Sequence, residues 1–146
     1  MKRTRILLAD DNPQIRELLR VILEPEFKVV GAAEDGETLL QYAQSLQPDV
    51  IISDINMPKI DGLQAARLLK DIAPRTPVIF LTARAEASYV AAAFAAGAAG
   101  YLIKGATSDL IGSLRSMISN LQPHMAIPYE AQLDTSPSSL EGRPAR

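Results

Sequence analysis

Short apolar runs alternate with longer segments of helical periodicity along most of the chain. The runs are Ile6–Ala9, Phe27–Ala32, Val50–Ser53, Val78–Leu81 and Gly100–Ile103. Several of them are hydrophobic almost without interruption, which is typical of strands that are buried on both faces of a parallel sheet. We therefore predict that these runs form the strands of one such sheet.

Apolar residues recur at helical spacing in the segments that follow these runs. The predicted helices are Pro13–Leu23, Glu37–Leu46, Leu63–Ile72, Glu86–Ala96 and Thr107–Leu121. Asn12 is a suitable cap for the first helix, and Thr107 or Ser108 for the last. The regular alternation of strand and helix predicts an α/β fold with right-handed crossovers, although the pattern leaves the strand order open.

The helical periodicity stops after Leu121. Residues 122–146 are rich in Pro, Ser and Gln and show no sustained period, so we expect a flexible linker or tail there. The 146 residues suit one globular domain, which we place at residues 1–121. We expect no output domain in this sequence, and we leave open whether one was truncated or the protein is a single domain with a tail.

Composition narrows the functional classes. The chain has no cysteine, which excludes disulfides, thiolate metal sites and a cysteine nucleophile. A formal net charge of -2 argues against nucleic-acid binding by charge alone. No apolar stretch approaches the ~18 residues that a membrane span needs, and the basic start lacks a signal-peptide core. We therefore expect a cytoplasmic protein without a membrane partner.

Polar residues follow the carboxyl ends of four of the apolar runs. Asp10 and Asp11 follow the first run, Asp54 the third, Thr82 the fourth and Lys104 the fifth. In a parallel sheet these ends share one edge, so we expect the side chains to converge in one crevice.

Such a group of side chains favours phosphoryl transfer assisted by a metal ion. Three neighbouring carboxylates repel one another, and a hard cation such as Mg2+, which prefers oxygen ligands, removes that repulsion. The ammonium of Lys104 and the hydroxyl of Thr82 are suitable donors for phosphoryl oxygens. A carboxylate can act as the nucleophile and form an acyl phosphate.

The same residues lie within longer motifs. These are LLADDNPQIRELL, DVIISDINMPKIDG, LTA and GYLIKG, spread over the region from Arg5 to Leu121. Together they resemble the response regulator receiver domain of two-component signalling. The resemblance implies a flavodoxin-like, doubly wound parallel sheet with strand order 2-1-3-4-5 and five helices.

The resemblance also implies roles for individual residues. Asp54 would be the phosphoacceptor. Asp10 and Asp11 would be the acidic pair that organises Mg2+, with Asp11 as a direct ligand beside Asp54 and the backbone carbonyl of Asn56. Lys104 would pair with the phosphoryl group.

Other positions match the family's response elements. Thr82 corresponds to the switch hydroxyl, and Tyr101 to the aromatic switch residue. Asn56 and Arg84, each two residues after a site residue, would tune dephosphorylation by controlling water access. Gly62 would allow a turn with positive φ in the loop after the acceptor.

The resemblance implies a signalling switch rather than an enzyme. A histidine kinase or phosphotransfer protein would donate the phosphoryl group, and the phosphorylated form would control a partner, a homodimer or a missing output domain. One departure is Gly105, where the family often has proline after the lysine. The surrounding sequence is similar to receivers that precede LuxR-type helix-turn-helix domains.

Two alternatives remain open. A haloacid dehalogenase-type phosphohydrolase also uses Asp, Thr, Lys and Mg2+, but it needs an acid two residues after its nucleophile, where this chain has Asn56. The second alternative is a receiver that acts as a scaffold without phosphorylation. The presence of Asp10, Asp11, Asp54, Thr82 and Lys104 argues against it.

Overall fold

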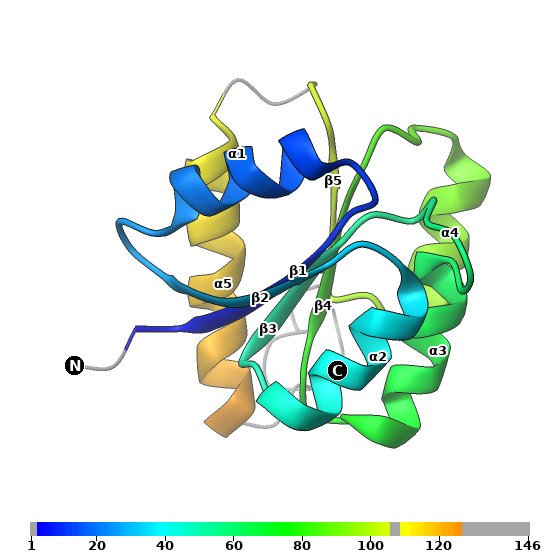
Figure 1. The fold of residues 1–146 in the computed structure, drawn as a ribbon, viewed down its shortest axis with the longest axis horizontal. Helices are drawn as coiled ribbons and strands as arrows, with labels where there is room; N and C mark the ends of the chain where they lie inside the picture. The colour runs from blue at the N-terminus through cyan, green and yellow to red at the C-terminus, as the bar shows by residue number, and fades with distance from the viewer. Residues whose placement is uncertain (1–2, 106–108, 127–146) are drawn as a thin grey trace, which may run out of the picture. The chain divides into compact units, whose positions relative to one another are not determined.

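The strands form one parallel sheet. The computed structural model describes residues 3–105 and 109–126, with side chains through Leu121. The strands are β1 (Arg5–Ala9), β2 (Lys28–Ala33), β3 (Val50–Ser53), β4 (Val78–Thr82) and β5 (Gly100–Ile103). They pair in the order β2-β1-β3-β4-β5, which confirms the predicted fold (Figure 1). Each strand begins and ends within one residue of a predicted run.

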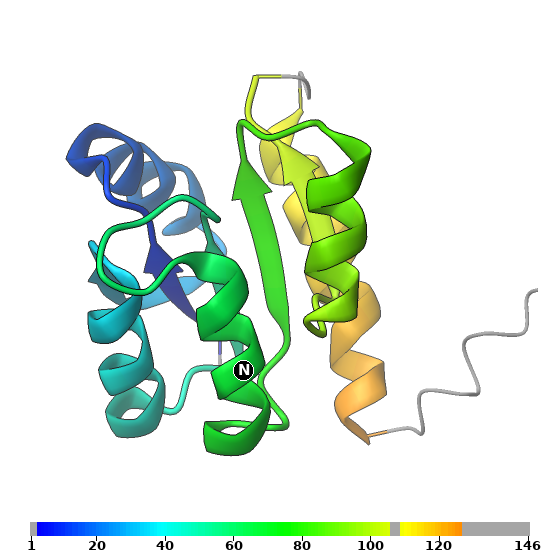
Figure 2. The same ribbon diagram turned by 90° about the vertical axis from the view of Figure 1, so that its right-hand side faces the viewer.

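The helices follow the strands one by one. They are α1 (Pro13–Leu23), α2 (Gly36–Leu46), α3 (Gly62–Ile72), α4 (Ala87–Ala95) and α5 (Leu110–Ala126). Helices α2, α3 and α4 lie on one face of the sheet and α1 lies on the other (Figures 1 and 2). No helix in the described part of the chain is long and apolar enough to span a membrane.

A first compact unit ends at Leu114, and α5 runs across this boundary into the second unit, which begins at Arg115. The predicted caps of α5, Thr107 and Ser108, lie outside the described residues. Asp109 accepts a hydrogen bond from the Gly112 backbone N–H at 3.0 Å. The helix continues to Ala126, so the prediction of a flexible segment is wrong for residues 122–126. These residues show no apolar period, which is why the sequence pattern placed the end of the helix at Leu121.

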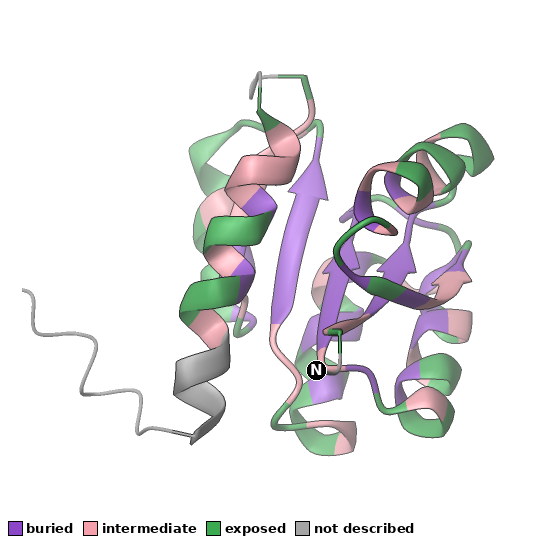
Figure 3. Cartoon of the chain, turned by 90° about the vertical axis from the view of Figure 1, so that its left-hand side faces the viewer, coloured by how far each residue is buried: buried purple, intermediate pink, exposed green. Residues whose placement is uncertain are grey.

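The strands in the middle of the sheet are buried on both faces. Every residue of β3 and β4 is buried, as the continuous colouring in Figure 3 shows. On the side of α2, α3 and α4, a single apolar cluster joins the sheet to the helices, and it includes Leu7, Ile51, Phe80, Leu39, Leu69 and Ala93. Burial of this kind stabilises the sheet edge on which the polar residues stand.

Short polar side chains start three of the helices. The carboxylate or amide oxygens of Asn12, Asp35 and Asp61 accept backbone N–H bonds from the first turns of α1, α2 and α3. Each cap satisfies backbone donors that have no partner within the helix. Helix α4 differs, because Glu86 at its start makes no capping hydrogen bond with its side chain.

The edge strand β2 pairs irregularly with β1. Ile6 lies opposite Val29, whereas the next residue, Leu7, lies opposite Gly31. Val30 is therefore an extra residue on the β2 side, as in a β-bulge.

Candidate functional site

Two carboxylates stand side by side at the carboxyl edge of the sheet. Asp10 follows β1 and Asp54 follows β3, and these strands are neighbours. The backbone N–H of Asp10 donates to Ala33 at 3.0 Å, and that of Asp54 donates to Ala9 at 2.8 Å. Both residues are thus fixed by backbone bonds that continue the sheet, and both are buried, with Asp10 2% and Asp54 8% exposed.

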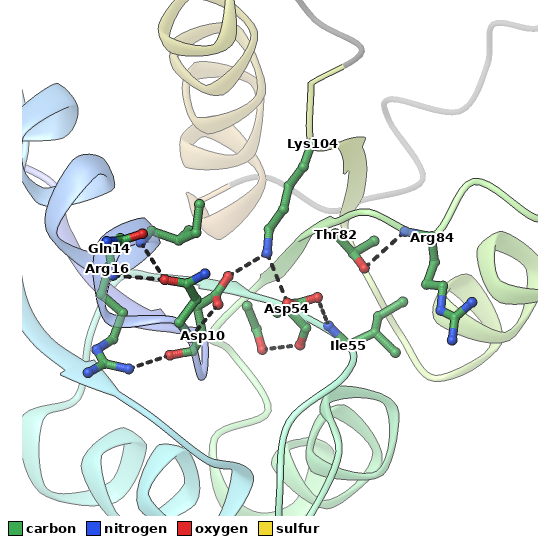
Figure 4. Close-up of polar contacts among 11 residues, drawn as sticks. Asp10, Gln14, Arg16, Asp54, Ile55, Thr82, Arg84 and Lys104 are labelled. Atoms are coloured by element: carbon green, nitrogen blue, oxygen red, sulfur yellow. Dashed lines mark hydrogen bonds and ion pairs between the residues drawn. The ribbon is translucent and has the colours of Figure 1, made fainter.

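Lys104 lies between the two carboxylates. Its Nζ donates to Asp10 Oδ2 at 2.7 Å and to Asp54 Oδ2 at 2.9 Å (Figure 4). Burial disfavours the ammonium form, but the hydrogen bonds to Asp10 and Asp54 outweigh this effect and raise the pKa of Lys104. Lys104 is therefore protonated at neutral pH and offsets part of the negative charge.

The remaining oxygen of each carboxylate is held by the backbone that follows it. Asp10 Oδ1 accepts from the Asn12 N–H at 2.9 Å, and Asp54 Oδ1 accepts from the Ile55 N–H at 2.6 Å. Both carboxylates are consequently fixed in direction before any ligand arrives.

Asp11 completes a cluster of oxygen ligands. One carboxylate oxygen from each of Asp10, Asp11 and Asp54 lies within 4.8 Å of the others. Asp11 is exposed, and its carboxylate takes part in no hydrogen bond or ion pair with the residues that the structure describes. An exclusively oxygen donor set that is partly open to solvent suits a hard divalent cation such as Mg2+, which keeps several waters.

The loop after Asp54 is compact for a different reason than predicted. Gly62 does not have a positive φ, whereas Lys59 does, at 69°. A Cβ on Gly62 would lie 2.1 Å from the backbone oxygen of Asp54, and the Gly62 N–H donates to Ile55 at 2.6 Å. Glycine is required at position 62 because the start of α3 approaches the backbone of the acceptor residue.

Thr82 faces the loop that leads to α4. It is fully buried at the end of β4, and its hydroxyl accepts a hydrogen bond from the Arg84 N–H at 3.3 Å. The bond belongs to the β4–α4 loop, and among the described residues no hydrogen bond joins Thr82 to Asp54 (Figure 4). The carbonyl of Thr82 accepts from the Lys104 N–H at 2.7 Å, which ties β4 to the end of β5.

Tyr101 is connected to the same loop. Its hydroxyl donates to the carbonyl of Arg84 at 2.8 Å, and its ring is tilted against Phe80 with centroids 6.4 Å apart. Burial raises the pKa of Tyr101, and the nearby carboxylate of Glu86 adds to the effect. The guanidinium of Arg84 lies 4.9 Å from the centre of the Tyr89 ring, in cation–π geometry.

Three features of the site were not predicted from the sequence. Arg16 donates to the backbone carbonyl of Asp10 at 2.7 Å. Tyr89 holds the guanidinium of Arg84. Gly105 has a φ of 78°, a conformation that proline cannot adopt, so the departure from the family pattern at this position has a backbone cause. The sequence offers one signal for the role of Arg16: it is a basic residue one turn into the helix that follows the acidic pair.

Comparisons with known proteins agree with this arrangement. A family model described as the response regulator receiver domain matches residues 6–115. The transcriptional regulatory protein DegU of Brevibacillus brevis is 40% identical over 111 residues, which cover 75% of this chain and 47% of DegU. The receiver domain of the response regulator NarL of Mycobacterium tuberculosis superposes with a TM-score of 0.76 at 30% identity, covering 82% of this chain and 98% of that one.

A LuxR-family DNA-binding response regulator from Staphylococcus aureus has the same fold, with a TM-score of 0.74 at 21% identity. That match covers 81% of this chain and 98% of the other. The chain spans about half the length of curated relatives such as DegU, of which it covers 47%.

Proposed function

Because the chain belongs to the response regulator receiver domain family of two-component signalling, we propose that Asp54 is its phosphoacceptor and that the domain is a phosphorylation-controlled switch. The observation that carries the proposal is the cluster of Asp10, Asp11 and Asp54, whose oxygens lie within 4.8 Å of one another with Lys104 bonded to Asp54. The family consists of signalling phosphoacceptors that bind Mg2+ in an acidic pocket.

Phosphoryl transfer would proceed on a carboxylate oxygen of Asp54. In the proposed reaction, this oxygen forms a bond to phosphorus while the bond from phosphorus to the donor's histidine nitrogen breaks, which leaves an acyl phosphate. Lys104 Nζ, now 2.9 Å from Asp54 Oδ2, would pair with the added phosphoryl oxygens. Asp54 Oδ1 is fixed by the Ile55 N–H, which limits the directions from which phosphorus can approach.

The acidic cluster would hold the metal ion. Asp11, Asp54 and the backbone carbonyl of Asn56 are the proposed protein ligands, and Asp10 orients the cluster through its bonds to Asn12 and Lys104. Bound Mg2+ supplies positive charge that offsets the carboxylates and the transferring phosphoryl group. This chain's own residues fit that ion, since all of their donor atoms are oxygens.

The response would pass through the β4–α4 loop. A phosphoryl group on Asp54 offers new acceptor oxygens to the Thr82 hydroxyl, which now accepts from the Arg84 N–H. If Thr82 turns toward the phosphoryl group, the loop loses one of the bonds that define it, and the Tyr101 hydroxyl bonded to Arg84 follows. Asn56, whose side chain is exposed, and Arg84 would set the access of water to the acyl phosphate.

We propose a histidine kinase or phosphotransfer protein as the donor, in the cytoplasm. The output would be a protein partner, a second copy of the chain or a further part of the protein. DNA contact would belong to such a further part, because the chain has a formal net charge of -2. The domain would have no substrate of its own apart from phosphorylation and dephosphorylation of Asp54.

The test is the intact mass after incubation with acetyl phosphate, with Mg2+ and with EDTA. We expect a Mg2+-dependent gain of about 80 Da, one phosphoryl group. Asp54→Asn should abolish the gain. The matched control is Asp61→Asn, which removes one carboxylate from the same loop and retains a good helix cap.

Normal labelling of Asp54→Asn would refute the assignment of the acceptor. A wild type that is labelled neither by acetyl phosphate nor by a panel of histidine kinases would favour the scaffold function. Turnover of a small phosphomonoester would favour the phosphohydrolase.

A further inference from the structure

Arg16 bonds to the backbone of the acidic pair. It lies on α1 (Pro13–Leu23), is half-buried, and its Nη1 donates to the carbonyl oxygen of Asp10 at 2.7 Å (Figure 4). Its own backbone N–H donates to the Asn12 carbonyl at 3.1 Å. These two bonds link α1 to the turn that contains Asp10, Asp11 and Asn12. The bond from the guanidinium is short and charge-assisted.

The carbonyl of Asp10 belongs to the peptide unit that joins Asp10 to Asp11. Because this unit is planar, fixing the direction of its oxygen fixes ψ of Asp10. The next N–H, that of Asn12, is bonded to Asp10 Oδ1 at 2.9 Å, so that φ of Asp11 is restrained as well. Those torsions set the direction in which the side chain of Asp11 leaves the chain. Arg16 therefore acts on Asp11 without touching it.

Asp11 depends on its backbone more than its neighbours do. The carboxylate of Asp10 is fixed by Asn12 and Lys104, and that of Asp54 by Ile55 and Lys104. Within the described residues, the exposed carboxylate of Asp11 has no comparable bond. The region that its carboxylate can reach therefore depends on where the backbone places its Cβ, and the peptide that Arg16 holds sets that placement.

We propose that Arg16 is a positioning residue of the Mg2+ site, which keeps the Asp11 carboxylate within reach of Asp10 and Asp54. The inference deepens the proposed function, because it rests on Mg2+ binding to these carboxylates. Removing Arg16 retains all of the ligand residues. It should, however, let the Asp10–Asp11 turn adopt other orientations, which weakens metal binding.

Charge alone predicts the opposite sign. A guanidinium near three carboxylates repels an incoming cation, so its loss should strengthen Mg2+ binding if Arg16 acted only through its charge. A positioning role predicts weaker binding. The sign of the change therefore separates the two roles.

The experiment is a titration of the full chain with magnesium chloride, without a phosphoryl donor, followed by the amide NMR signals of the site. The variants are Arg16→Gln, Arg16→Lys and the matched control Arg20→Gln. Arg20 lies one turn further along α1 in a partly exposed ion pair with Glu24 at 3.8 Å, so its substitution makes the same change in charge. We expect Arg16→Gln to raise the Kd for Mg2+ by about tenfold, as is usual for residues that orient metal ligands.

Arg16→Lys, which keeps the charge but has a shorter reach, should raise the Kd by a smaller factor, and Arg20→Gln should leave it unchanged. In the absence of metal, the amide signal of Asp11 should shift in Arg16→Gln and not in Arg20→Gln. An unchanged or lower Kd in Arg16→Gln would overturn the proposal. If Arg16→Gln does not fold, Arg16→Lys decides, and a Kd equal to that of the wild type overturns it.

The outcomes separate this inference from the proposed function. A wild type that binds Mg2+ but cannot be phosphorylated would sink the phosphoacceptor assignment and leave the role of Arg16 standing. A wild type that does not bind Mg2+ would overturn both.

Discussion

The two halves of the site differ in how they are held. In the acceptor half, the Lys104 side chain is bonded to the carboxylate of Asp10 at 2.7 Å and to that of Asp54 at 2.9 Å. In the switch half, Thr82 and Tyr101 are bonded to the backbone of one residue, Arg84, which the former contacts at its N–H and the latter at its carbonyl. Ion pairs between side chains hold the acceptor half together, whereas hydrogen bonds to the backbone of one loop hold the switch half together.

This difference indicates which half of the site can change conformation more easily. Strand ends β1, β3 and β5 meet in the acceptor half, so that its geometry is set by the sheet. The switch half depends on a loop before α4, which is the shortest of the helices in the described chain and starts without a side-chain cap. A ligand on Asp54 can therefore alter the loop at lower cost than it can alter the sheet edge.

The largest effect is expected when the acceptor half loses its cation. Lys104→Met leaves the buried carboxylates of Asp10 and Asp54 without a counter-charge. We expect a loss of unfolding free energy of about 2 kcal/mol in EDTA, reduced from the value for a fully buried pair because the Lys104 side chain is 23% exposed. Mg2+ should restore part of this loss. Urea unfolding with and without Mg2+ measures both.

Lys59→Met is the matched control. The side chain of Lys59 is 60% exposed, and its Nζ lies 3.7 Å from Asp35 and 3.6 Å from Glu37. Glu37 is exposed like Lys59, and the Asp35 side chain, 5% exposed, keeps its hydrogen bond from the Thr38 N–H at 2.7 Å, so we expect a loss of about 1 kcal/mol or less. Equal effects of the two substitutions would show that the acceptor half is not held by its buried charges.

Thr82→Val tests whether the hydroxyl belongs to the switch half. The substitution keeps the shape of the side chain but leaves the Arg84 N–H without its acceptor, at a cost of about 1 kcal/mol. We expect labelling of Asp54 by acetyl phosphate to persist, and the phosphorylation-dependent shift of the Arg84 amide signal to disappear. Thr82→Ser should behave like the wild type, and loss of labelling in Thr82→Val would place Thr82 in the acceptor half.

Tyr101→Phe should have a smaller effect on the same loop. It removes the hydrogen bond to the Arg84 carbonyl, which we expect to contribute about 0.5–1 kcal/mol. The control is Tyr42→Phe on α2, where the tyrosine is exposed. Chemical denaturation of both variants measures the loss of unfolding free energy. Equal losses in the two variants would contradict the prediction.

Alkaline pH should weaken both halves slightly. The pKa values of Lys104 and Tyr101 are raised in the folded protein, so the folded state binds these protons more tightly. Their contribution to stability is complete below the unfolded pKa values of about 10 and is lost as the pH rises through the folded values. The urea midpoint of the wild type should fall above pH ~10, and by less in Lys104→Met and in Tyr101→Phe. Parallel pH profiles of all three proteins would contradict this.

The sequence was sufficient for features that depend on strand ends. Continuous apolar runs located the strands, and because parallel strands end at one edge, the meeting of Asp10, Asp54 and Lys104 could be predicted. The carboxylate cluster with Asp11 confirms that convergence. The metal and switch roles of these residues stay predictions.

Features that depend on loop conformation could not be predicted. The partner of Thr82 is a backbone N–H whose direction is set by the β4–α4 loop, and no spacing rule encodes that direction. Gly62 was assigned a positive φ, but its lack of a side chain serves the close approach of α3 to Asp54. The bond from Arg16 to Asp10 could not be predicted because its acceptor is a main-chain oxygen, and every residue type has one.

The irregular pairing at Val30 has a consequence for the protein in a crowded solution. β2 is an outer strand of the sheet, and an outer strand presents unpaired backbone groups to which a strand of another molecule can add. The extra residue interrupts the regular spacing of those groups and increases the local twist, and the exposed Lys28 adds a charge at the start of the same strand. A foreign strand therefore finds only a short stretch in register, which disfavours edge-to-edge aggregation.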